Sequence, residues 1–229
     1  MDVKPTKQCD LKTCFMCRHA LREWVPFIGI KKKNIQLNKG NQFIREGDPV
    51  TGIYFVCSGK VKVHKQWGDK EIIVRFAHGG AIVGHRGFTT KGNLFPISAT
   101  ALEPTLVCFV ELEFFMSTLK VNTELTYQLM LFYADELKES EQKMYNLVHM
   151  TVKHRLALAI IRLHAEFGTT ASGFINIQLS RQDLASYVGT TYESLFRMMN
   201  ELAREGLIAV DGKQIRIENL AALSALTRI

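Results

Sequence analysis

The 229-residue chain lacks any uninterrupted apolar run of about 18 residues, the length that a membrane-spanning helix needs. Its opening stretch, MDVKPTKQCD, lacks the apolar core of a secretory signal peptide. The sequence therefore predicts a cytoplasmic protein with no membrane partner. In that reducing compartment, closely spaced cysteines more often form a metal site, a redox pair or plain thiols than disulfides.

Charge of one sign is not in large excess either. The chain carries 29 Lys and Arg residues against 22 Asp and Glu residues, a formal net charge of +7. A basic balance permits binding to a polyanion, but many basic proteins bind none, so the charge decides nothing by itself. Apolar residues make up 47% and charged residues 22% of the chain, as in an ordinary globular protein, and the length predicts one or two domains.

Short apolar runs separated by glycine turns extend from about residue 27 to 110. In one of them Ile53, Phe55 and Cys57 alternate with other residues, and a glycine turn follows. Alternation with a period of two is typical of strands that bury one face. Strands this short and this regularly spaced predict an antiparallel barrel or roll.

Glycine and proline are absent from about residue 112 to 150, where the sequence predicts a long helix. Larger side chains recur there at alternating intervals of three and four, the spacing of a seam through which two helices pair. Its flanks are charged, for example at Glu136 and Lys143. The narrow seam predicts a helix that pairs with its twin in a homodimer, and the alternative is a helix packed on its own barrel. The seam residues are Met130, Tyr133, Leu137, Ser140, Met144, Leu147 and Thr151.

The last third of the chain changes character again. VKHRLALAIIRLHAEFG predicts an amphipathic helix that ends at Gly168, and FINIQL, after a polar loop, predicts a short strand. Ser180 with Asp183 fits a capping box at the start of the next helix, SRQDLASYV.

Gly189 then ends that helix, and Thr190 with Glu193 predicts the cap of a second one, TYESLFRMMNELARE. The segment IAVDGKQIRI follows, and Asp211-Gly212 within it predicts a hairpin turn. Helix, glycine turn, helix and hairpin together form the layout of a winged helix-turn-helix, whose second helix enters the major groove of DNA.

The start of that second helix carries the residues that would meet base edges. Glu193 and Arg197 are four positions apart and share a helical face. An arginine binds guanine O6 and N7 with two hydrogen bonds, and a carboxylate accepts one from cytosine N4, so the pair suits G·C base pairs. The alternative is a surface salt bridge worth a few tenths of a kcal/mol. The candidate DNA contacts are Thr190, Thr191, Tyr192, Glu193, Phe196 and Arg197.

The stretch LSRQDLASYVGTTYESLFRMMNELAREGLIAVDGKQIRIEN resembles the DNA-binding domain of the Crp/Fnr family of bacterial transcription regulators. The preceding barrel and long helix are similar to that family's cyclic-nucleotide-binding-type domain and dimerisation helix, and the resemblance covers about residues 25 to 225. It implies an α+β fold with an antiparallel β-roll and no enzymatic activity. The expected parts are a cysteine-containing segment (1–24), the β-roll (25–120), the dimerisation helix (121–150) and the winged helix-turn-helix (151–229).

The resemblance also implies how DNA is bound. Glu193 and Arg197 correspond to the family's base-reading residues in each half of a palindromic site, and the partners would be double-stranded DNA, RNA polymerase and a second copy of the chain. Where the family commonly has Ser or Gly, this chain has Phe196, which could touch a thymine methyl group or turn into the core. Ser180, Arg181 and Gln182 open the first helix of the motif, where backbone amides and side chains can meet phosphates.

Family members that bind cyclic AMP hold its ribose and phosphate with a Gly-Glu pair and a later Arg-Ser-Ala. In this chain His85 replaces the glutamate and Ile97 replaces the arginine, although Arg86 is close in sequence. Because a buried phosphate without a cationic partner is costly, cyclic AMP is not the expected effector. The roll would take another small effector or serve as a platform in a constitutively active protein. The degenerate effector pocket consists of Gly84, His85, Arg86, Ser98 and Ala99.

Three cysteines fall within CDLKTCFMC near the start of the chain. Fnr-type members hold an oxygen-sensitive [4Fe-4S] cluster with three N-terminal cysteines and one from the strand before the long helix, which is the place of Cys108. The spacing of the cysteines differs here from the usual Fnr pattern. Two alternatives to the cluster therefore remain: a zinc site with His19 or Cys108 as a ligand, and free thiols. Cys57 is interpreted as a small core residue. The cluster ligands implied by the resemblance are Cys9, Cys14, Cys17 and Cys108.

A thiol oxidoreductase is the weak alternative to a DNA-binding regulator. Cys14 and Cys17 form a C-x-x-C motif, but such a motif normally opens a helix after a strand in an α/β fold, and no such pattern surrounds it. A regulator that is not an enzyme is therefore the prediction.

Overall fold

The computed structural model of the chain describes residues 10–90 and 92–227, so Cys9 lies outside the described residues. The chain divides into two compact units, of which the first ends at Glu136 and the second begins at Leu137. This boundary falls inside the long helix α4 (Thr123–His149). Among the helices of the described ranges, none combines the length and apolar character that crossing a membrane requires.

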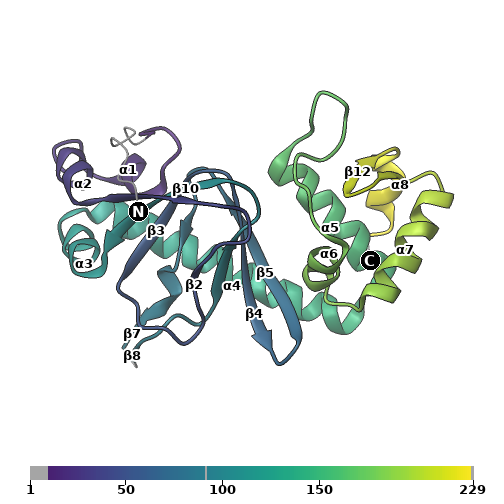
Figure 1. The fold of residues 1–229 in the computed structure, drawn as a ribbon, viewed down its shortest axis with the longest axis horizontal. Coiled ribbons are helices and arrows are strands. Elements are labelled where there is room, and N and C mark those ends of the chain that lie inside the picture. The colour runs from purple at the N-terminus through teal and green to yellow at the C-terminus, as the bar shows by residue number, and fades with distance from the viewer. Residues whose placement is uncertain (1–9, 91, 228–229) are drawn as a thin grey trace. The chain divides into compact units, whose positions relative to one another are not determined.

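The first unit is an antiparallel β-roll, as the sequence predicted (Figure 1). Two four-stranded sheets enclose its core, and every neighbouring pair of strands runs antiparallel. One sheet has the order β1 (Lys33–Leu37), β10 (Thr105–Glu111), β3 (Gly52–Ser58), β6 (Ile82–Val83). The other has the order β2 (Gln42–Ile44), β9 (Ser98–Ala101), β4 (Lys60–Trp67), β5 (Lys70–His78). A 3₁₀ turn, η1 (His85–Gly87), precedes the small pair β7 (Phe88–Thr89) and β8 (Gly92–Asn93).

The alternating residues of β3 and β4 face the core of the roll. Ile53, Phe55, Val61 and Val63 are all buried there. Cys57 does not follow this pattern: it is exposed, so the interpretation of it as a core residue is wrong. The register between β10 and β3 shifts at this point, because Leu106 pairs with Ser58 and Val107 with Val56. Cys57 is the residue left over at that irregularity, where the alternation of buried and exposed side chains is interrupted.

Three short helices accompany the roll: α1 (Phe15–His19), α2 (Val25–Lys31) and α3 (Leu112–Val121). The first two were not predicted, and α3 and α4 were predicted as one helix. Asn122 separates α3 from α4; its side-chain amide donates to the carbonyl of Thr118, and its Oδ1 accepts from the amide of Leu21 at 2.7 Å. The indole of Trp24 also donates to the Thr118 hydroxyl at 3.0 Å. These bonds hold the segment before α2 against the α3–α4 junction.

The second unit is a winged helix-turn-helix, again as predicted. Its core is formed by buried leucine and isoleucine side chains from three helices, including Leu156, Leu184 and Leu195. Its elements in chain order are the end of α4, α5 (Val152–Phe167), α6 (Arg181–Val188), α7 (Tyr192–Arg204), β11 (Ile208–Asp211), β12 (Gln214–Ile217) and α8 (Leu220–Ala225).

Two local predictions in this unit differ from the structure. The run FINIQL (174–179) is not a regular strand, because Ile175 forms only an isolated bridge with Thr169. Its isoleucines are nevertheless buried, and the amide of Ile175 donates to the carbonyl of Ile215 at 2.8 Å, so the alternation reflects burial without a ladder. In the hairpin Asp211 pairs with Gln214, which moves the two-residue turn to Gly212-Lys213.

Candidate nucleic-acid interface and buried ion cluster

The turn between α6 and α7 is set by residues at both ends of α6. The Ser180 hydroxyl accepts from the amide of Asp183 at 2.9 Å, which confirms the predicted cap. Gly189 ends the helix with a φ of 72°. A Cβ at Gly189 would lie 2.6 Å from Cδ2 of Leu147, so both the backbone conformation and the close packing require glycine.

Arg155 of α5 also stabilises this turn. Its guanidinium donates to the carbonyl oxygens of Met150 at 2.7 Å, Val188 at 3.1 Å and Gly189 at 3.0 Å. The last two carbonyls belong to the C-terminal end of α6, which has no further helical partner for them. Arg155 therefore fixes the path from α6 into α7, a role that no local sequence pattern predicts.

The helix α7 begins one residue later than predicted. Its N-cap is Thr191, whose hydroxyl accepts from the amide of Ser194 at 3.3 Å. Thr190, the predicted cap, instead donates its backbone amide to the carbonyl of Ala185 at 3.0 Å. That bond makes Thr190 part of the C-terminal cap of α6, so the preceding helix determines where α7 can start.

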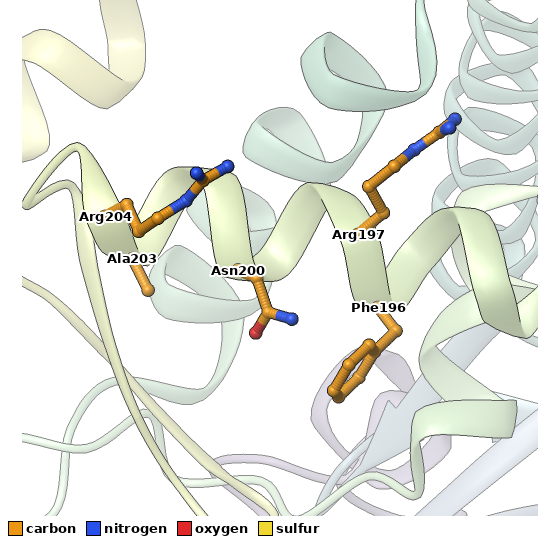
Figure 2. A pocket seen from close by; sticks show the side chains of 5 residues that line it. All are labelled: Phe196, Arg197, Asn200, Ala203 and Arg204. Carbon is orange, nitrogen blue, oxygen red and sulfur yellow. The ribbon is translucent and has the colours of Figure 1, made fainter.

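One face of α7 is buried and the opposite face is exposed. Leu195, Met199 and Leu202 pack into the core of the unit. On the outward face, side chains of both polar and apolar character line a shallow groove (Figure 2): Phe196, Arg197, Asn200, Ala203 and Arg204. Phe196 is 51% exposed, which excludes the alternative that its ring turns into the core.

Glu193 and Arg197 lie on this outward face, and both are exposed. Of the ion pairs that the described residues form, none joins these two side chains. The surface salt bridge considered as the alternative is therefore not formed, and both groups are available to a partner. The helix is instead held on α5 by Lys153, whose ammonium contacts Glu201 at 2.7 Å and Glu205 at 2.6 Å.

The start of α6 contacts the wing. The Arg181 guanidinium donates to the carbonyl of Gly212 in the turn between β11 and β12, and burial lowers the pKa of this arginine. The contact of Arg181 with phosphate stays a prediction; in the structure its guanidinium contacts the wing. The side chain of its neighbour Gln182 is exposed.

A buried carboxylate is the main polar feature of the β-roll, and the sequence prediction missed it. Glu136 of α4 was interpreted as part of the charged flank of the seam, yet it is only 7% exposed. Its Oε1 lies 2.8 Å from Nε of Arg75, and its Oε2 lies 2.6 Å from Nε2 of His85 and 2.9 Å from Nε of Arg86. Tyr133, one turn earlier on α4, donates its hydroxyl to the carbonyl of His85. These contacts join α4 to the roll.

The protonation states in this cluster follow from its contacts. Burial by itself raises the pKa of Glu136, but the hydrogen bond from His85 and the nearby charges of Arg75 and Arg86 outweigh it and lower the pKa to about 2. Burial lowers the pKa of His85, against the opposing effect of Glu136. At neutral pH a neutral His85 therefore donates from Nε2 to an ionised Glu136.

The cluster contains two of the predicted effector-pocket residues, His85 and Arg86, but not the others. Ser98 is buried, and its hydroxyl accepts from the amide of Glu46 at 3.0 Å and from the Gln42 side chain at 3.2 Å. Ala99 is fully buried, as is the neighbouring Ile97, which offers no charge. Ser98 and Nε of Arg86 thus already have partners within the protein.

An exposed and mostly apolar row of side chains runs along α4. Its members are spaced at alternating intervals of three and four, and we call them the α4 row: Tyr127, Met130, Ala134, Leu137, Glu141, Met144 and Val148. Met130, Leu137 and Met144 belong to the predicted seam as well. Tyr133 instead packs against the roll, and Leu147, 41% exposed, lies beside Gly189. Ser140 is half-buried, and Thr151 is the N-cap of α5.

The thiols near the start of the chain lie against the core of the roll. Cys17 and Cys108 are buried in it, and Cys14 packs against it. The segment is docked by the amide of Phe15, which donates to the carbonyl of Gly80 at 2.9 Å. Thiolates are the ligands that soft iron and zinc prefer. Within residues 10–90 and 92–227, however, no three Cys, His, Asp or Glu side chains converge as a metal site would require. The three described thiols are therefore not arranged as a metal site, and Cys9, the fourth implied ligand, lies outside the described residues.

Comparison with known proteins agrees with both units. Residues 154–226 match the model of the Crp-like helix-turn-helix domain, and residues 34–122 match that of the cyclic nucleotide-binding domain. The structure of FixK2 from Bradyrhizobium japonicum superposes with a TM-score of 0.76 at 23% identity, over 86% of this chain and 98% of that one. This likeness supports the fold.

Two curated relatives align with most of the chain. The transcriptional activator protein anr of Pseudomonas aeruginosa is 31% identical over 201 residues, which is 86% of this chain and 81% of the relative. The transcriptional activator protein FnrA of Stutzerimonas stutzeri is 29% identical over 225 residues, 96% of this chain and 91% of the relative. The chain therefore belongs to the Crp/Fnr family of transcription regulators, and it binds DNA through its helix-turn-helix rather than acting as an enzyme.

Proposed function

We propose that the protein binds a palindromic DNA site as a homodimer and activates transcription by contacting RNA polymerase. The observation that carries the DNA contact is the outward face of α7, where Glu193 and Arg197 are exposed and not paired with each other. The names of the curated relatives, which are transcriptional activators, favour activation over repression.

Each half-site is read by the start of α7. The Arg197 guanidinium donates two hydrogen bonds to O6 and N7 of a guanine, and the Glu193 carboxylate accepts one from a cytosine N4. Arg204, on the same exposed side of the helix, adds a positive charge near the phosphates. The N-terminal end of α6, at the exposed Gln182, contacts the sugar-phosphate backbone of the DNA. This contact carries no sequence information.

The test begins with DNA sites selected from random duplexes by the full-length protein. Arg197→Ala should weaken binding to the selected site by about 1–3 kcal/mol and lose discrimination at one G·C pair in each half-site. Arg22→Ala, which removes an exposed arginine from the first unit, is the matched control and should bind like the parent. Equal affinities of Arg197→Ala and the parent would refute the assignment.

We further propose that the signal acts through the cysteines, with a [4Fe-4S] cluster as the group that they hold. The resemblance to Fnr-type regulators and the position of three thiols at one core support this, although the described side chains do not converge on one point. Such a cluster supplies sensitivity to oxygen. Zinc or free thiols are the alternatives, and iron content with the visible spectrum of protein purified without air distinguishes them.

Cyclic AMP is not the proposed effector of the roll. The Glu136 carboxylate already neutralises Arg75 and Arg86, so a cyclic phosphate would have to displace a buried anion. We expect the affinity for the selected DNA site to be the same with and without cyclic AMP. A cyclic AMP-dependent increase in that affinity would refute this part of the proposal.

A further inference from the structure

Two aromatic rings are exposed side by side on the outward face of α7. Tyr192 is 44% exposed and Phe196 is 51% exposed, although the core of the unit is filled by residues from the opposite face of the helix. The two rings are nearly parallel, with an interplanar angle of 8° and centroids 6.3 Å apart. Stacking limits the rotation of both rings and keeps an apolar surface in place at the start of the helix.

The surroundings of this pair are polar and cationic. Phe196 lines the same groove as Arg197, Asn200 and Arg204, and Figure 2 shows its ring and the Asn200 side chain directed to the same side of the helix. Figure 2 shows Arg197 and Arg204 directed to the other side of the same helix. A helix that presents an apolar pair on one side and arginines on the other complements a surface that is anionic overall but carries an apolar group. In the major groove of DNA that group is the C5-methyl of thymine, the apolar substituent on the base edges there.

We propose that Phe196, positioned by its stacking on Tyr192, is a specificity-determining residue that reads the C5-methyl group of a thymine beside the G·C pair bound by Glu193 and Arg197. This inference rests on the proposed function, because it requires the start of α7 to enter the major groove. It adds a base to the recognised half-site without a hydrogen bond. The contact removes one methyl group and part of the phenyl ring from water, which favours thymine over cytosine and over uracil.

Replacing thymine by uracil tests the methyl contact by itself, since uracil keeps the Watson–Crick pairing and the O4 acceptor. Each thymine of the selected half-site is replaced in turn, and binding by the full-length parent protein is measured. At one position the dissociation constant should rise about fourfold, the equivalent of ~0.8 kcal/mol for one buried methyl group. Other thymines should show no such effect.

Phe196→Ala should bind the thymine and uracil versions of that site equally. Phe196 is exposed, so the variant is expected to fold, and Leu220→Ala, which removes an exposed side chain from α8, is the control that should keep the fourfold preference. Tyr192→Phe retains the stacked ring and should keep the preference, whereas Tyr192→Ala should reduce it. This difference separates a positioning role from a hydroxyl contact.

Each other outcome overturns a defined part of the argument. If uracil weakens binding nowhere while Arg197→Ala still does, the methyl contact is refuted and the proposed function stands. If uracil affects the parent and Phe196→Ala alike, another residue reads the methyl group. If Phe196→Ala changes only the sedimentation of the protein, the two rings contact another protein molecule rather than DNA. If the parent selects no sequence from random duplexes, the proposed function itself fails.

Discussion

The Glu136 carboxylate brings together three nitrogen-containing side chains of the roll. Arg75, His85 and Arg86 each lie within 2.9 Å of one of its oxygens. Burying a carboxylate is costly, but here each oxygen has a charged or hydrogen-bonding partner that offsets the loss of water. Because Glu136 belongs to α4, the cluster stabilises the contact between this helix and the roll.

Glu136→Gln tests this cluster. The amide keeps the size of the side chain but removes the charge, so Arg75 and Arg86 lose their anion. We expect the free energy of unfolding at pH 7, measured by urea denaturation, to fall by about 2 kcal/mol. This is less than the roughly 3–5 kcal/mol for breaking a fully buried pair, because Arg86 is partly exposed. Asp135→Asn, at the exposed neighbouring position, should stay within about 0.5 kcal/mol of the parent.

The same pair of proteins should differ in its pH dependence. The pKa of Glu136 is about 2 in the folded chain, against an ordinary value of 4.5. A lowered carboxyl pKa means that this stabilisation is fully present above pH 4.5 and is lost as the pH falls towards 2. The difference in unfolding free energy between parent and Glu136→Gln should therefore shrink across that range. A difference that stays constant between about pH 5 and about pH 3 would contradict the assignment.

The cysteines give a second prediction at single residues. If Cys14, Cys17 and Cys108 hold a metal, serine at any of them should abolish iron retention, because a protonated hydroxyl is a poor ligand for soft iron. Cys57→Ser is the matched control: its side chain is exposed at the end of β3, so iron content should not change. Colourless protein that retains zinc in Cys108→Ser would favour the zinc alternative.

At the level of elements, the two threonines at the start of α7 have different roles in the structure. The Thr191 hydroxyl caps the helix, whereas Thr190 contributes its backbone amide to the end of α6. Thr191→Ala should lower the free energy of unfolding by about 1 kcal/mol. Thr190→Ala leaves that amide in place and should change it by less than about 0.5 kcal/mol. Thermal or urea denaturation measures both, and equal losses would contradict the assignment of Thr191 rather than Thr190 as the cap.

Elements that depend on adjacent residues could be predicted from the sequence. The Ser180 cap and the Gly189 stop need only a few neighbouring residues, and both agree with the structure. The cap of α7 was misplaced by one residue, because the preceding helix uses Thr190 for its own end. Local chemistry therefore predicted the helix-turn-helix and its outward face to within one residue.

Elements that depend on distant residues could not be predicted in this way. Arg155 reaches carbonyls at positions 188 and 189, and Glu136 binds side chains about 50 positions earlier in the chain. The run FINIQL has the alternation of a strand, but it forms an isolated bridge with Thr169 and a bond from Ile175 to Ile215 of β12 rather than a ladder. In each case the decisive partner is supplied by the tertiary fold.

At the scale of the whole molecule, the α4 row is the surface that best explains a homodimer. Five of its members are large apolar residues that are more than half exposed: Tyr127, Met130, Leu137, Met144 and Val148. Large apolar side chains at this spacing are typical of a helix that pairs with another helix. A second copy of α4 would cover the row, and the two winged domains would then be available for the two halves of a palindromic DNA site.

Leu137→Glu tests this surface at a position that the predicted seam and the α4 row share. In a parallel pair of helices the two glutamates would face each other in an apolar contact, where neither is solvated, so the variant should sediment as a monomer. Glu139→Lys changes an exposed charge off the row and should remain a dimer. A monomer can occupy only one half-site at a time, so Leu137→Glu should also bind the selected palindrome far more weakly than the parent while keeping its affinity for a single half-site. A Leu137→Glu variant that still sediments as a dimer would place the interface on another surface of the chain.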